Sequence, residues 1–273
     1  MNRIDETFAK LRQIGHKAFI PFVTAGDPDI ATSHEIVLAL AAAGADIIEL
    51  GVPFSDPMAD GPTIQASSMR SLAAGTTLTH VLSMVADLRQ TTDVPIVLFS
   101  YLNPLHRYSI DRLAQDAAAA GVDGILVTDI VDDEAQKLSQ TFAEHGIHLI
   151  SLIAPTTSAE RIRSIAAAAH GFLYAVARAG VTGVQQASST DAESLVIHAR
   201  AITELPIAVG FGISNRAHVT DVWRYADGAV VGSAIVAEIA NSKREDAAAR
   251  VTKLVTELLP PKEINQGRIK PRC

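Results

Sequence analysis

Two carboxylic acids close together in the sequence are the residues best suited to proton transfer. Glu49 lies inside the apolar run Ile47–Leu50, and Asp60 follows in a loop rich in proline. A carboxyl group among Ile and Leu side chains loses hydration, which raises its pKa and lets it exchange a proton near neutral pH. A second carboxyl group on a loop has a different environment, so the two can divide acid and base roles.

Both residues also have an ordinary structural interpretation. Glu49 can be a solvated residue at the end of a strand, and Asp60 can cap a helix that starts at Gly61-Pro62. Charged residues are seldom buried without a partner or a role, which favours the functional interpretation of Glu49.

Glycines after two later apolar segments are suited to binding an anion. Gly210-Phe211-Gly212 and Gly232-Ser233-Ala234 each follow such a segment. Glycine lets backbone N–H groups approach an anion closely, and barrel enzymes often bind phosphate in the loops after strands seven and eight. The alternative is that these glycines only form tight turns.

A third loop, from Arg178 to Ser189, is polar, contains Gly180 and Gly183, and is long enough to act as a closing lid. An ordinary flexible connection is the alternative. The nine histidines show no metal-binding constellation, and His145 and His148 are expected at the surface. No Ser-His-Asp or Cys-His pattern is present, so no metal or nucleophile is predicted.

Short apolar segments alternate with amphipathic ones along the chain. Continuous apolar runs are typical of parallel strands that are covered on both faces. The eight segments are Ala18–Val23, Asp46–Leu50, Pro95–Phe99, Gly124–Val127, His148–Ile153, Phe172–Val176, Pro206–Val209 and Gly228–Val231. They predict an α/β fold, a single (β/α)₈ TIM barrel over residues 1–258. The rival, an open doubly wound sheet, is disfavoured because no Gly-x-Gly-x-x-Gly follows the first segment.

Ala-rich segments with helical spacing lie between the predicted strands, and several of them end in glycine, as helices often do. They include Ser33–Ala43, Leu78–Arg89, Ile110–Ala120 and Ala159–Ala169. Residues 1–15 predict an extra N-terminal helix whose apolar face, Ile4, Phe8 and Leu11, covers the bottom of the barrel. The polar, proline-bearing segment Leu259–Cys273 is expected to be a disordered tail.

Composition excludes several classes of function. The chain has 273 residues, 48% hydrophobic and 19% charged, which supports a sizeable core. A net charge of −7 is unsuited to neutralising the phosphates of a nucleic acid. No apolar run reaches the roughly 20 residues that cross a bilayer. The one cysteine, Cys273, excludes an intrachain disulfide and fits a cytoplasmic protein.

Five stretches of the sequence together resemble the tryptophan synthase alpha chain family. The longest runs from Glu49 to Gln65, and the others are Pro21–Pro28, Gly180–Gly183, Gly210–Ile213 and Gly232–Val236. The resemblance continues in register from about residue 3 to 258. It implies a lyase of tryptophan biosynthesis that cleaves indole-3-glycerol phosphate to indole and glyceraldehyde 3-phosphate by a retro-aldol reaction.

The resemblance also implies roles for individual residues. Glu49 would protonate C3 of the indole ring and help to remove the proton of the glycerol hydroxyl. Asp60 would hydrogen-bond the ring N–H and stabilise the positive charge on the ring. The implied indole pocket consists of Phe22, Phe99, Tyr101, Leu126, Ile153 and Tyr174. The implied phosphate site consists of Gly183, Phe211, Gly212, Gly232 and Ser233, with Thr182 beside it.

The family's partner is a beta chain that carries pyridoxal phosphate, in an alpha2-beta2 heterotetramer. Indole would pass to this partner, and the present chain would hold no cofactor. The loop Pro53–Asp60 and the predicted lid would couple the two active sites. Ala177 stands where the family often has Ser, and Val131 where Pro is common, which affects lid timing and communication with the partner.

Two other functions fit some of these features. Another phosphate-binding barrel, such as an isomerase or an aldolase, would use the same glycines. A Schiff-base aldolase needs a lysine at the end of a strand, and the predicted strands contain none. A catalytically silent subunit that only activates a partner would have no need of both Glu49 and Asp60.

Overall fold

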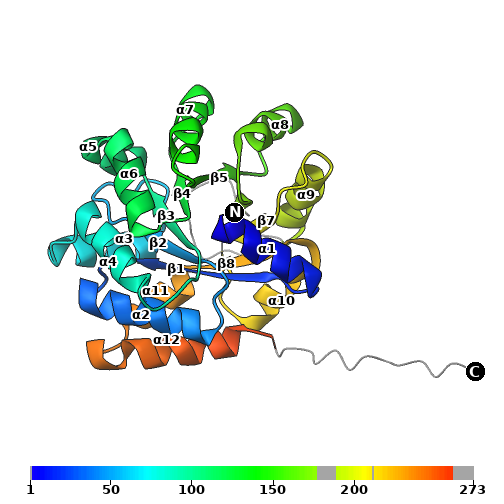
Figure 1. Ribbon diagram of the computed structural model, residues 1–273. Coiled ribbons are helices and arrows are strands. Elements are labelled where there is room, and N and C mark those ends of the chain that lie inside the picture. Colours follow the sequence, from blue (N-terminus) through cyan, green and yellow to red (C-terminus); the bar gives the residue numbers. More distant parts are fainter. Residues whose placement is uncertain (1, 177–188, 211, 261–273) are drawn as a thin grey trace, which may run out of the picture.

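The structure, a computed structural model, describes residues 2–176, 189–210 and 212–260. Eight parallel strands form a closed barrel in chain order, and helices surround it (Figure 1). The strands are β1 (Ala18–Thr24), β2 (Ile48–Gly51), β3 (Ile96–Ser100), β4 (Gly124–Val127), β5 (His148–Ile153), β6 (Leu173–Val176), β7 (Ile207–Gly210) and β8 (Gly228–Val231). Closure comes from pairing of β8 with β1, where Ala18 lies opposite Gly228. The predicted barrel is confirmed, and the open sheet is excluded.

The helices mostly follow the strands that they cover. They are α1 (Arg3–Gln13), α2 (Ile30–Ala43), α3 (Pro62–Ala73), α4 (Leu78–Leu88), α5 (Leu102–Tyr108), α6 (Ile110–Ala120), α7 (Asp132–Ala143), α8 (Ala159–Ala168), α9 (Ser189–Arg200), α10 (Arg216–Tyr225), α11 (Ser233–Ala240) and α12 (Arg244–Leu258). Helix α2 begins earlier than its apolar pattern predicts because Asp29 caps it, accepting a hydrogen bond from Thr32 N at 2.9 Å. Gly44 and Gly121 end α2 and α6 in the left-handed conformation, with φ of 107° and 87°.

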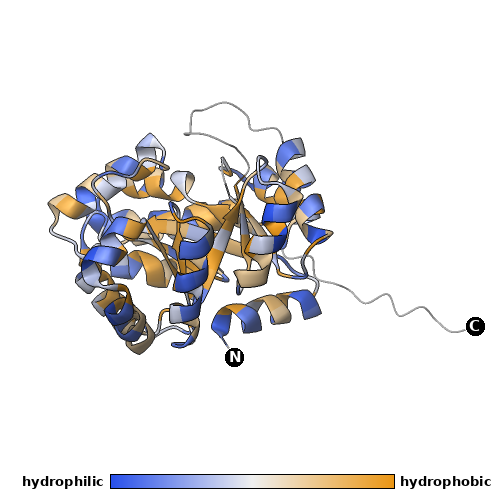
Figure 2. Ribbon diagram, turned by 90° about the horizontal axis from the view of Figure 1, so that it is seen from above, coloured by the Kyte–Doolittle hydropathy of each residue, from blue (hydrophilic) through white to orange (hydrophobic). Residues whose placement is uncertain are grey.

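Strand residues alternate between two apolar layers. Inward-facing residues such as Ile20, Val97 and Leu126 fill the barrel interior. Their outward-facing neighbours, among them Phe19 and Leu98, pack against the surrounding helices. Figure 2 displays the result as apolar strands at the centre, enclosed by helices with hydrophilic outer faces. Because both faces of each strand are buried, the strands read as continuous apolar runs.

Helix α1 covers the N-terminal end of the barrel, as predicted, and Figure 1 shows it lying across the strands. Its residues Ile4, Phe8 and Leu11 are buried in the interior cluster. Asp5 of this helix accepts a hydrogen bond from Nε2 of His148 at 2.8 Å. The expectation that His148 is a surface residue is therefore wrong, because its side chain is only 15% exposed. With this end closed, chemistry is left to the opposite, C-terminal end.

The ends of the chain are described in part. Residues 261–273, most of the predicted tail, lie outside the described residues. Leu259 follows α12 and packs, partly buried, against the outer apolar layer. Within the described ranges, the structure contains no helix with the length and apolar character needed to cross a bilayer.

Candidate active site

Glu49 lies in the barrel interior among apolar strands. In the strand register it stands beside Phe22 of β1 and Val97 of β3. Its side chain is fully buried, and neither carboxylate oxygen has a hydrogen-bond partner among the described residues. Burial raises the pKa of Glu49 to about 8. The group is therefore protonated at neutral pH and can donate a proton from a site shielded from water.

The alternation of β2 explains why this acid points inward. Ile48 and Leu50 belong to the outer layer that packs against the helices, whereas Ile47 belongs to the interior cluster. Glu49 shares the parity of Ile47 and so faces the interior. Gly51 ends the strand, and an added Cβ there would lie 2.6 Å from Cζ of Phe22. The glycine therefore makes room for an aromatic ring next to the acid.

Asp60 lies in the loop between β2 and α3. Helix α3 begins at Pro62, and Gly61 occupies the capping position without a side-chain hydrogen bond. The helix-cap interpretation of Asp60 is therefore wrong. Burial raises the pKa of Asp60 to about 6, and a hydrogen bond with the Tyr101 side chain opposes this rise. At neutral pH the carboxylate is mostly ionised, in contrast to Glu49.

The loop that carries Asp60 is held from two directions. The hydroxyl of Tyr101, which follows β3, accepts a hydrogen bond from Ala59 N at 2.9 Å. Nε2 of Gln65 on α3 donates to the backbone oxygens of Asp60 at 2.9 Å and of Pro57 at 3.4 Å. The sequence pattern assigned no role to Gln65. The position of Gln65 in the first turn of α3, shortly after Asp60, is the signal that could have indicated this role.

Tyr174 of β6 connects the two acids electrostatically. Its pKa is raised well above the usual value, first by burial and then by the nearby charges of Glu49 and Asp60. Both carboxyl groups therefore lie within electrostatic range of one phenol. The hydroxyl of Tyr174 rests against Gly210, where an added Cβ would collide with it. The structure thus brings Tyr174, which is distant in the sequence, close to the two acids.

Aromatic and aliphatic side chains form a wall around these acids. The rings of Phe22 and Phe99 are 5.3 Å apart and nearly perpendicular. Leu126 lies in the interior cluster, and the half-buried Phe99 packs against the same cluster. An apolar ring such as indole can pack against this wall.

Ile153 is not part of this wall. It belongs to the outer layer, between the barrel and the helices. Its neighbour Leu152 packs against the interior cluster and lies opposite Tyr174 in the strand register. Because successive strand residues face opposite ways, only one of the two can line the interior. Of these two residues, Leu152 therefore packs on the inner face of β5, and Ile153 on the outer face.

Two glycines, Gly212 and Gly232, follow β7 and β8 at the mouth of the barrel. Gly212 has φ of +71°, and no atom lies within 4 Å of an added Cβ. Gly232 precedes α11, which begins at Ser233, and an added Cβ there would lie 3.5 Å from Cβ of Phe22. The N-terminus of α11 therefore lies on the same side of the barrel as the acids, and a helix N-terminus can bind an anion.

Several predicted residues cannot be placed. Thr182, Gly183, Phe211, Ala177 and the lid segment 178–188 lie outside the described residues. Val131 precedes α7 and is 60% exposed. No group of three or more His, Cys, Asp or Glu side chains in the described ranges could hold a metal ion.

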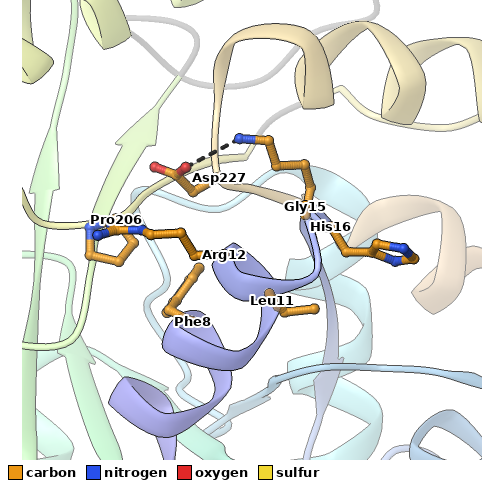
Figure 3. Close-up of a pocket in the computed structure, with 8 residues that line it drawn as sticks. Phe8, Leu11, Arg12, Gly15, His16, Pro206 and Asp227 are labelled. Atoms are coloured by element: carbon orange, nitrogen blue, oxygen red, sulfur yellow. Dashed lines mark hydrogen bonds and ion pairs between the residues drawn. The ribbon is translucent and has the colours of Figure 1, made fainter. Parts of the chain in front are cut away.

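A hollow of about 130 Å³ lies at the opposite end of the barrel (Figure 3). Phe8 and Leu11 of α1 line it, and an ion pair between Lys17 Nζ and Asp227 Oδ1 borders it at 3.3 Å. It lies at the N-terminal ends of the strands, and neither Glu49 nor Asp60 lines it. It is therefore no part of the candidate active site.

Comparisons with known proteins find similar sequences along most of the chain. The family model described as Tryptophan synthase alpha chain matches residues 8–263. A tryptophan synthase alpha chain of Citrifermentans bemidjiense is 52% identical over 86% of this chain and 88% of its own length. Another from Geotalea daltonii is 45% identical, with coverage of 94% and 98%.

Solved structures of similar sequence share the fold. The crystal structure of tryptophan synthase subunit alpha from Legionella pneumophila has a TM-score of 0.87 and 37% identity, and covers 94% of this chain and 97% of its own. The tryptophan synthase complex from Pyrococcus furiosus contains a chain with a TM-score of 0.81 and 40% identity, covering 88% and 97%.

Proposed function

The chain belongs to the tryptophan synthase alpha chain family, and from this premise we propose that Glu49 and Asp60 perform the chemistry of its reaction. The family activity is that of a carbon–carbon lyase in tryptophan biosynthesis, which cleaves indole-3-glycerol phosphate to indole and glyceraldehyde 3-phosphate. One observation carries the assignment of roles: Glu49 is fully buried, has no partner among the described residues, and has a pKa of about 8.

The reaction breaks the bond between indole C3 and the hydroxyl-bearing carbon of the glycerol chain. Protonated Glu49 donates its proton to C3, which leaves a positive charge on the ring. The Glu49 carboxylate then accepts the proton of the adjacent glycerol hydroxyl. The oxygen of this hydroxyl becomes the carbonyl oxygen of the aldehyde. The electron pair of the broken C–C bond returns to the ring and restores indole. Such a positioned acid–base group contributes typically about 10²- to 10⁴-fold.

Asp60 stabilises the positive charge that forms on the indole ring and takes no part in the proton transfer to carbon. Protonation of C3 places positive charge on the ring nitrogen, and an ionised carboxylate that accepts the ring N–H stabilises this charge. The lower pKa of Asp60, about 6, supports this division because Asp60 is ionised at a pH at which Glu49 is protonated. Tyr101 hydrogen-bonds Asp60 and fixes the direction of its carboxylate.

Substrate binding follows from the surroundings of the two acids. We assign the indole pocket to Phe22, Phe99, Tyr101, Leu126 and Tyr174, with Leu152 in place of Ile153. The phosphate is assigned to Gly212, Gly232 and Ser233, where glycine backbone and the N-terminus of α11 favour an anion. Thr182, Gly183 and Phe211 join this site by family resemblance.

The partner of the chain is the tryptophan synthase beta chain, and we propose an alpha2-beta2 heterotetramer in which the beta chain holds the pyridoxal phosphate. The loop from Pro53 to Asp60 is proposed as the link to this partner. Met58 on this loop is 82% exposed, which supports a contact surface there. A cytoplasmic location is proposed from the single cysteine of the sequence.

The direct test is to incubate the purified chain with indole-3-glycerol phosphate, with and without a beta chain, and to follow indole release. Indole is expected in both cases, and faster with the partner present. Absence of indole in both reactions would contradict the proposed activity. A chain that accelerates the beta reaction but never forms indole would instead be a silent activating subunit.

A further inference from the structure

Helix α3, which follows the Asp60 loop, is anchored by polar side chains. Its buried residues are Ser67, Ser68 and Ser71, where α4 buries mainly Leu, Val and Met. The hydroxyl oxygen of Ser67 is 2.6 Å from that of Thr24, at the end of β1. The Ser71 hydroxyl donates to the backbone oxygen of Ala25 at 2.5 Å. Hydrogen bonds are directional, so these contacts fix the position of α3 over the end of β1.

An ion pair adds to this anchor. Arg70 of α3 donates through Nε and Nη2 to the two carboxylate oxygens of Asp27, at 2.8 Å and 2.7 Å. The Asp27 side chain is only 1% exposed. A bidentate pair of this kind specifies orientation as well as distance. Helix α3 is therefore a rigid support at the mouth of the barrel.

Gln65 connects α3 to the loop that carries Asp60. It lies in the first turns of α3, and its amide nitrogen donates to the backbone oxygens of both Asp60 and Pro57. On the other side of the loop, Tyr101 accepts the N–H of Ala59 and hydrogen-bonds the Asp60 carboxylate. The backbone of Asp60 is therefore held from α3, and its side chain from the end of β3.

We propose that Gln65 is a positioning residue for the lyase reaction, which fixes the Asp60 backbone so that its carboxylate meets the ring nitrogen of the substrate. The inference rests on the proposed function of Asp60. The hydrogen bonds of Gln65 within the described part of the chain go to backbone oxygens, so Gln65 acts through the loop. A small displacement of a group that must stabilise charge in the transition state lowers the rate while leaving substrate binding nearly intact.

The test uses Gln65→Met, which keeps the approximate shape of the side chain and removes both N–H donors. Its kcat and KM for indole formation are measured in the complex with a beta chain, together with its thermal unfolding. We expect kcat to fall about 10-fold and KM to stay within about twofold. Gln65→Lys keeps a donor and should recover most of the lost kcat.

A matched control is Gln115→Met on α6, where the glutamine is exposed. It should leave kcat and KM unchanged. If Gln65→Met fails to fold, Gln65→Glu replaces it, because the carboxylate has the same shape and cannot donate when ionised. Normal kcat in the folded variant, or a loss that Gln65→Lys does not recover, would overturn the role of Gln65.

Asp60→Asn separates this inference from the function on which it rests. If Asp60→Asn lowers kcat and Gln65→Met does not, Asp60 keeps its role and Gln65 loses it. If Asp60→Asn has normal turnover, the role of Asp60 itself fails. Because Gln65 acts through Asp60, Gln65→Met should have little further effect in the Asp60→Asn background. An undiminished further loss in that background would show that Gln65 acts by another route.

Discussion

Two buried carboxyl groups, one toward each end of the barrel, have opposite surroundings. At the N-terminal end, Asp123 accepts hydrogen bonds from Arg89 at 2.7 Å, Arg3 at 3.0 Å and the backbone N–H of Ile96 at 2.9 Å. At the C-terminal end, Glu49 is just as buried and has no partner among the described residues. A paired acid contributes to stability, whereas an unpaired one is held protonated and is available for chemistry.

The same hydrogen bond, from a backbone N–H to an aspartate, recurs at three places at the N-terminal end. An aspartate just before each of β2, β4 and β8 accepts the N–H of a residue in the preceding strand. The bonds join Asp46 to Phe19 at 2.8 Å, Asp123 to Ile96 at 2.9 Å, and Asp227 to Ile207 at 3.0 Å. Each satisfies a backbone donor at the start of a strand. This end is therefore built for stability, and the comparison with Glu49 can be tested by substitution.

The largest expected effect is that of Glu49→Gln at the C-terminal end. The amide keeps the shape of the acid and cannot donate a proton to carbon, so indole formation should fall at least about 10²-fold. Substrate binding, followed by titration with indole-3-glycerol phosphate, should change little. Turnover close to that of the wild type would remove Glu49 from the mechanism.

The same substitution should also change how stability depends on pH. The pKa of Glu49 in the folded protein, about 8, lies above its usual value of 4.5, so this group favours the folded state below pH 4.5 and loses that contribution as pH rises through about 8. Each pKa unit corresponds to about 1.4 kcal/mol. The free energy of unfolding should be measured with urea at pH 6 and at pH 9. From pH 6 to pH 9, the stability of Glu49→Gln should rise relative to that of the wild type. A constant difference at both pH values would contradict the raised pKa.

Asp60→Asn tests the second acid and should lower kcat by about 10²-fold at neutral pH. In the wild type, kcat/KM should fall below about pH 6 as Asp60 is protonated and above about pH 8 as Glu49 loses its proton. Because the two carboxyl groups interact, the apparent pKa values of the two limbs describe the pair and not either residue alone. The acidic limb should disappear in Asp60→Asn, and a limb that persists there must come from another group.

Asp123→Asn is the matching change at the N-terminal end. It removes a charge that Arg89 and Arg3 share, and should lower the free energy of unfolding by about 2 kcal/mol. The kcat of the folded protein should stay within about twofold. Asp93→Asn is the control, because this side chain is 94% exposed and its contact with Arg3 is 3.9 Å long. A large loss of kcat in Asp123→Asn would mean that the two ends are not separate in function.

The smallest expected effect is at the phosphate site. Gly232→Val places methyl groups where the anion is proposed to approach the backbone, and should weaken binding of glycerol phosphate about 10-fold. Binding of free indole should change less. Equal weakening of both ligands in parallel titrations would show that Gly232 does not contact the phosphate.

Much of the fold could be predicted because its signals are local. Apolar runs separated by helical segments predict parallel strands, and Ile4, Phe8 and Leu11 recur at the spacing of a helix face that must be covered. In β5, however, residues on both faces are apolar, so the pattern does not reveal which face points inward. The family resemblance implied Ile153 for the pocket, and the apolar pattern could not test this, whereas the structure has Leu152 on the inner face.

The sequence by itself determined the eight strands, the helix that closes one end, and an acid inside an apolar run, because each depends on neighbouring residues. Only the tertiary structure decided that Glu49 has no hydrogen-bond partner among the described residues, that Asp123 accepts from Arg89, Arg3 and Ile96, and that Gln65 reaches the loop of Asp60. A charge and its partner come from different strands and helices. Their pairing depends on the closure and register of the barrel, which no local pattern contains.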